Sequence, residues 1–176
     1  MKNTCTSVLL GLLVGLTSIG CEQGPTNRTP LVYFEISPSW EKVTVRQIGQ
    51  MFPGLPTPYY LPKGYQIQEV YFNELPESNP HVTQIYLVIS DQPIVQQGGT
   101  VRARLVLNID WHAPGFSLKM PWAQPISEVN GRLVNSDGEY VLWWEKFDST
   151  LRLYSSNRFP KGELIKIASY INTGPD

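Results

Sequence analysis

The sequence predicts an α+β fold, in which an antiparallel, curved sheet of about six to eight strands has a short N-terminal helix and a C-terminal helix packed on it. Three observations predict this class. Several short segments alternate apolar and polar residues, as half-buried antiparallel strands do. Asn-Gly and Asp-Gly pairs lie between consecutive segments, as in hairpin turns. The last apolar segment instead has the spacing of an amphipathic helix.

The first expected elements are a strand and a short helix. Residues 31–36 form a brief apolar segment, which predicts the strand. Val45, Ile48 and Phe52 follow with near-helical spacing. A helix is therefore expected over residues 43–52, and the Pro-Gly pair behind it is a stop signal.

The middle of the chain has the alternation of a half-buried sheet. Three strands are expected there, over residues 66–73, 83–90 and 102–110. In the second strand Ile85, Leu87 and Ile89 fall on one side, and the third strand repeats this pattern. The strands should therefore bury one face in the core.

Two hairpin turns are expected next, at Asn130-Gly131 and at Asp137-Gly138. These residue pairs adopt the positive φ angles that two-residue turns require. The strands beside them are expected over residues 126–129, 132–135 and 139–147. Two consecutive hairpins predict a meander.

A last strand and a helix complete the domain. The chain is expected to turn at Asp148-Ser149 into a strand over residues 150–155. A closing helix is expected over residues 160–171. Its apolar face would comprise Leu164, Ile167, Ala168 and Ile171.

Three short motifs lie in the order found in one protein family. They are Leu61-Pro62-Lys63-Gly64-Tyr65, Val141-Leu142-Trp143-Trp144-Glu145 and Gly162-Glu163-Leu164-Ile165-Lys166-Ile167-Ala168. Over residues 58–171 the chain thus resembles the domain of unknown function family 4367. The resemblance implies an exported bacterial lipoprotein, or the extracytoplasmic part of a regulator such as an anti-sigma factor. It implies a binding or sensing role and brings no catalytic residues.

An apolar leader ends at Cys21, which is the most informative residue of the chain. Lys2 precedes an apolar core over residues 8–19, and Gly20 stands directly before the cysteine. This order is similar to a lipoprotein signal peptide, whose cysteine is acylated, with palmitate for example, and anchors the mature chain. An ordinary cleaved signal and an uncleaved membrane helix are the alternatives. The apolar run is shorter than the roughly 20 residues that span a bilayer.

The sequence accordingly divides into three parts. A lipoprotein signal peptide is expected over residues 1–20, a flexible, polar tether over residues 21–30 and a single domain over residues 31–176. Cys5 would leave with the signal peptide, so Cys21 would be the one cysteine of the mature protein. We therefore expect a lipid-anchored location on the extracytoplasmic face of a membrane of the bacterial cell envelope.

Charge and motif content exclude several function classes. The 14 Lys and Arg residues balance 15 Asp and Glu residues, so there is no basic field for nucleic acid. A hydrolase would need His112 as base, Asp110 or Asp91 to orient it, and Ser117 or Ser90 as nucleophile. No Gly-x-Ser-x-Gly motif supports such a triad, and the separated His81 and His112 do not have zinc-ligand spacing. We expect no enzyme activity, cofactor or metal.

One connection is unusually rich in aromatic residues, proline and glycine. It follows the third predicted strand and precedes the Asn130-Gly131 turn. Long apolar connections often bind ligands or act as lids, although the simpler interpretation, which we favour, is that this one caps an open end of the sheet. The candidate ligand or partner contacts are Trp111, Phe116, Trp122 and Trp144.

Two functions follow as expectations. The first is a membrane-anchored, non-catalytic binding or sensing module for a protein partner. The alternative is an envelope carrier or receptor that holds a small apolar ligand, such as lipid, between the sheet and its helices. A hydrolase is the remote third. Because Trp143 and Trp144 are adjacent on a strand, one of them should enter the core and the other should face away from it.

Overall fold

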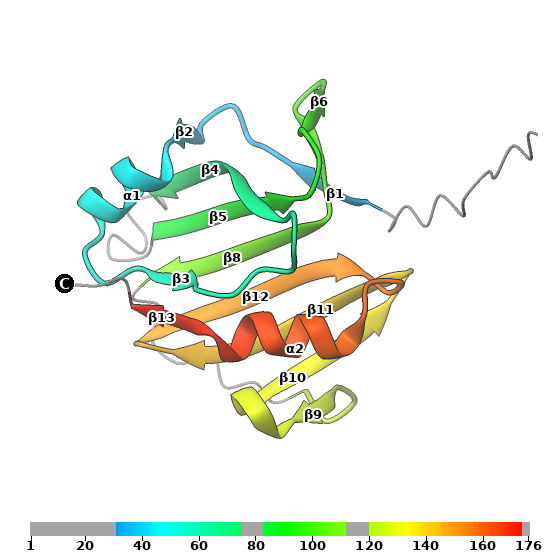
Figure 1. Ribbon diagram of the computed structural model, residues 1–176. Helices are drawn as coiled ribbons and strands as arrows, with labels where there is room; N and C mark the ends of the chain where they lie inside the picture. Colours follow the sequence, from blue (N-terminus) through cyan, green and yellow to red (C-terminus); the bar gives the residue numbers. More distant parts are fainter. Residues whose placement is uncertain (1–30, 75–82, 112–119, 174–176) are drawn as a thin grey trace, which may run out of the picture.

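The centre of the fold is an eight-stranded antiparallel sheet with strand order β2-β4-β5-β8-β12-β11-β10-β9 (Figure 1). The computed structural model describes residues 31–74, 83–111 and 120–173. The strands of this sheet are β2 (Glu41–Val43), β4 (Gln66–Glu74), β5 (Thr83–Ser90), β8 (Leu105–Trp111), β9 (Gln124–Ile126), β10 (Gly131–Ser136), β11 (Glu139–Lys146) and β12 (Ser149–Ser156). The predicted α+β class with an antiparallel sheet is confirmed.

Two small sheets accompany the large one. One has the order β1-β7-β6, with β1 (Val32–Glu35), β6 (Val95–Gln97) and β7 (Thr100–Ala103). The other pairs β3 (Pro56–Pro58) with β13 (Ile171–Thr173). The strand expected over residues 102–110 therefore changes sheets at Arg104, which separates β7 from β8. The Arg104 side chain is buried, and its Nε donates to Asp91 Oδ1 at 2.9 Å, so the crossing point is held by an ion pair.

Both helices cover the same face of the large sheet. In Figure 1, α2 (Lys161–Ser169) lies along β11 and β12, while α1 (Val45–Met51) lies beside β4. A capping box between Thr44 and Gln47 fixes the start of α1. The main core lies under the helices and includes Ile48, Leu164, Ile167 and Ala168 together with the inward residues of the strands. The closing helix ends earlier than predicted, because Ile171 starts β13.

A second, smaller apolar cluster lies on the opposite face. The small sheet of β1, β7 and β6 packs there over β4, β5 and β8. The buried members of the cluster are Val32, Tyr71, Val88, Val101, Ala103 and Val106. Since the small sheet contacts chiefly this half of the face, the half formed by β12, β11 and β10 carries half-buried side chains such as Trp143 and Tyr154.

The turns confirm one prediction and correct two. Asp137 and Gly138 have φ angles of 52° and 84° and form the predicted two-residue hairpin. The Asn130-Gly131 prediction is wrong in detail: Asn130, at φ 50°, ends a 3₁₀ helix over Ser127–Val129, and the glycine opens β10. The next turn is formed by Phe147 and Asp148, both with positive φ, one residue earlier than predicted.

Gly131 is the tightest of the described glycines. A Cβ atom on it would lie 2.4 Å from the Trp143 carbonyl oxygen. Gly131→Ala should therefore lower the free energy of unfolding by about 1–3 kcal/mol through overpacking, measured by chemical denaturation. Gly49→Ala is the matched control, since Gly49 is exposed in α1 with nothing within 4 Å of the added Cβ. It should stabilise by about 0.5–1 kcal/mol, and equal effects of the two changes would contradict the close packing of Gly131.

Candidate functional site

The sheet face opposite the helices holds a group of polar side chains from β8 and β12. In these strands the leucines point toward the helices, and their neighbours in sequence point the other way. The register pairs Arg152 with Asn108, and Thr150 with Asp110. All four residues are buried or nearly so. Burying polar groups is costly unless they bind one another, so the hydrogen bonds of this face decide what it can do.

Arg152 is the centre of the polar network. Its Nη1 donates to Asn108 Oδ1 at 2.9 Å, and its Nη2 donates to Asp110 Oδ2 in an ion pair. Gln84 Nε2 donates to the other oxygen of Asp110 at 3.3 Å. The guanidinium also lies over the Trp143 ring, 4.5 Å from its centroid. Arg152 is thus neutralised and held on several sides, which makes it a structural cation rather than a free site for an anion.

An aromatic group lies beside this network and joins it to the small sheet. Tyr86 of β5 stacks on Trp40 with a centroid distance of 4.4 Å and contacts Phe34 of β1 at 4.8 Å. Burial, followed by the negative charge of Asp110, raises the pKa of Tyr86 to about 12. Tyr86 is therefore a neutral phenol at physiological pH.

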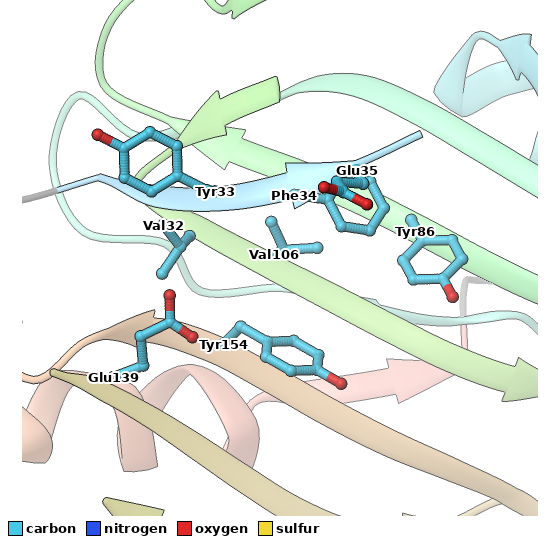
Figure 2. Close-up of a pocket in the computed structure, with 8 residues that line it drawn as sticks. All are labelled: Val32, Tyr33, Phe34, Glu35, Tyr86, Val106, Glu139 and Tyr154. Atoms are coloured by element: carbon cyan, nitrogen blue, oxygen red, sulfur yellow. The ribbon is translucent and has the colours of Figure 1, made fainter. Parts of the chain in front are cut away.

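A cavity of about 260 Å³ lies between β1 and the large sheet (Figure 2). Its lining combines apolar, aromatic and carboxylate side chains from five strands, β1, β5, β8, β11 and β12. The residues are Val32, Tyr33, Phe34, Glu35, Tyr86, Val106, Glu139 and Tyr154. Such a mixture of apolar walls and a few polar groups is typical of small-molecule sites, so this cavity is the candidate binding site.

Glu139 gives the cavity its charge. It is the first residue of β11, and Figure 2 shows its carboxylate directed toward β1 and Val32. Burial, followed by the negative charge of Asp137, raises the pKa of Glu139 above its ordinary value. None of the ion pairs within the described residues includes Glu139. The cavity therefore presents a partly desolvated carboxylate that forms no ion pair with any described side chain.

The structure describes three of the four predicted contact residues, and they differ widely in exposure. Trp111 packs against the main core, edge-on to Phe52 at 6.4 Å. Trp122 is 70% exposed, and Phe116 lies outside the described residues. Trp144 is only 1% exposed, because it shares the core face with Leu142, two residues earlier. The outward indole of the pair is Trp143, under Arg152.

Of the hydrolase residues that the structure describes, Ser90 and Asp110 lie apart. Ser90 pairs with Gln66 at one end of β5, whereas Asp110 pairs with Gln84 near the other end. Six residues of strand place them about 20 Å apart. Asp91 is paired with Arg104 at the Ser90 end. His81, His112 and Ser117 lie outside the described residues, so the triad itself stays untested.

The described ranges contain no group of three His, Cys, Asp or Glu residues that could hold a metal ion. The same ranges contain no helix with the length and apolarity needed to cross a membrane.

Comparison with known proteins finds no relative. No protein-family model matches the chain, and neither a curated protein nor a solved structure is significantly similar to it. The resemblance to family 4367 therefore depends on the three short motifs alone and stays a prediction.

The sequence interpretation missed Arg152, Glu139, Tyr86 and Tyr154. A signal for Arg152 was present, because β12 reads Leu-Arg-Leu-Tyr and β8 reads Leu-Asn-Ile-Asp. Both strands have polar residues at alternate positions of an otherwise apolar segment. Two such strands side by side would place those residues together on one face. The pattern of either strand alone, however, does not show that β8 and β12 are neighbours in the sheet.

Removal of Arg152 tests whether its ion pair is structural. Arg152→Met should lower the free energy of unfolding by about 3 kcal/mol in denaturant titrations, because Asp110 would stay buried without its cation. Lys42→Met is the control, since Lys42 pairs with Glu69 from a side chain that is 54% exposed. That change should cost less than about 1 kcal/mol. If the two variants lose the same stability, Arg152 is not the anchor of this face.

Proposed function

We propose that the protein is a membrane-anchored lipoprotein of the bacterial cell envelope whose extracytoplasmic domain is a non-catalytic binding or sensing module. The sequence pattern around Cys21 supports the anchor, and the cavity beneath β1 supports the binding role. In this proposal the mature chain begins at Cys21, and residues 22–30 connect the lipid to β1.

The observation that carries the binding role is the composition of the cavity. Three aromatic rings, from Phe34, Tyr86 and Tyr154, enclose it together with Val32. Sites for small molecules in proteins combine such apolar walls with a few placed polar groups. The polar group here is the carboxylate of Glu139, which the fold keeps without a protein cation in the described part of the chain.

The position of β1 supports a link between binding and attachment. β1 forms one wall of the cavity and is also the first strand after the tether. A ligand held under β1 would therefore lie next to the point where the chain leaves for the membrane. This arrangement suits a module that reports on its ligand at the membrane surface.

The structure supports the carrier alternative less well than the binding module. It requires room for an apolar ligand between the sheet and the helices, where the described side chains form a core with Ile48, Leu164 and Ile167 fully buried. The cavity beneath β1 lies on the other face and is slightly below the usual range of about 300–1,000 Å³ for small-molecule pockets. A head-group-sized ligand fits this volume better than a whole lipid.

The anchor is tested by Cys21→Ala in a bacterial host that processes lipoproteins. The change should abolish labelling by a palmitate analogue and move the protein out of the detergent-soluble membrane fraction, because two or more acyl chains supply the membrane affinity. Cys5→Ala is the matched control and should change neither readout, since Cys5 lies within the predicted signal peptide. Membrane retention and acyl labelling of the Cys21→Ala protein would refute the anchor.

A further inference from the structure

The cavity beneath β1 offers an organic cation two kinds of attraction at once. Aromatic side chains border it, and a positive charge near a ring face is attracted by the ring's quadrupole. The same space contains the carboxylate of Glu139, and Glu35 stands at its rim. An aromatic enclosure that also holds a carboxylate is the arrangement that recognises ammonium groups.

The charges around the cavity favour a cation over other ligands. Arg104 and Arg152 are each paired with a carboxylate, of Asp91 and Asp110 respectively. Arg102 of β7 lies 5.4 Å from the centroid of the exposed Tyr33 ring, so that ring is already in contact with a cation. An anionic ligand would meet Glu139 and Glu35. A neutral apolar ligand would desolvate Glu139 further without pairing it, at a cost in free energy.

We propose that this cavity is a binding site for a small alkylammonium ion. The ammonium group would lie between Glu139 and the rings of Phe34, Tyr86 and Tyr154, with its methyl or methylene groups against Val32 and Val106. The volume of about 260 Å³ accommodates a head-group-sized ion and excludes long chains. This inference rests on the proposed binding role of the domain, and it does not depend on the lipid anchor.

Choline is the probe, and 3,3-dimethylbutan-1-ol is its neutral control of the same shape. The full chain, purified in dodecyl maltoside, is titrated with each compound by isothermal calorimetry. Fluorescence offers a second readout, since Trp40 stacks on Tyr86 at the cavity. Choline should bind about tenfold more tightly than the alcohol, or better, because only choline carries the positive charge. Equal binding of the two compounds, or binding of neither, would overturn the proposal.

Glu139→Gln removes the charge and keeps the shape of the side chain. It should weaken choline binding about tenfold, whereas Glu145→Gln, the same change at an exposed position of β11, should leave it unaltered. Phe34→Leu removes one ring without changing charge and should weaken binding several-fold. Circular dichroism melts confirm that each variant is folded. Wild-type affinity in both Glu139→Gln and Phe34→Leu would contradict the assignment.

The two proposals fail in different ways. If choline does not bind but Cys21→Ala releases the protein, the ligand class is wrong and the anchored module stands. If choline binds through Glu139 but Cys21→Ala is retained and acylated, the site stands and the anchor is wrong.

Discussion

The pairing of β8 with β12 is the constraint on which the rest of the structure depends. These strands join the part of the large sheet formed by β2, β4 and β5 to the part formed by β11, β10 and β9. Their register sets Leu107 opposite Leu153 and Asn108 opposite Arg152. A slip of one residue would turn the leucines away from the helices and place the arginine in the core. The Arg152–Asp110 ion pair, which forms in the correct register, therefore supports the same pairing that builds the core.

The same register thus produces two faces of the sheet, which differ in how completely they are packed. The helix-covered face is closed by apolar packing, and the large side chains of its core are fully buried. The opposite face is only partly covered by the small sheet, whose edge strand β1 stands over the β8 and β12 ladder. The cavity forms where β1 meets Glu139 and Tyr154. The proposed binding site therefore lies on the face that packing leaves incomplete, next to the polar network of β8 and β12.

Local patterns predicted the elements better than their arrangement. Alternation located β4, β5 and β8, and the Asp137-Gly138 pair located one hairpin, because period and turn chemistry are properties of neighbouring residues. The Arg152 network joins residues that lie 44 and 42 positions apart. Strand order of this kind is not encoded in any short segment, so the cavity could not be predicted. The two tryptophans are a second example. Their neighbouring positions on one strand predicted that Trp143 and Trp144 face opposite sides of the sheet, but not which of them is buried.

The central claim is that the β1 face is where this domain binds. The most direct measurement is the mapping of amide chemical shifts by nuclear magnetic resonance during a choline titration of the isotope-labelled full chain in dodecyl maltoside. The account predicts shift changes concentrated in Val32–Glu35 and around Glu139 and Tyr154, with α2 unaffected. Changes centred on α2 or near Trp122, with β1 silent, would contradict it.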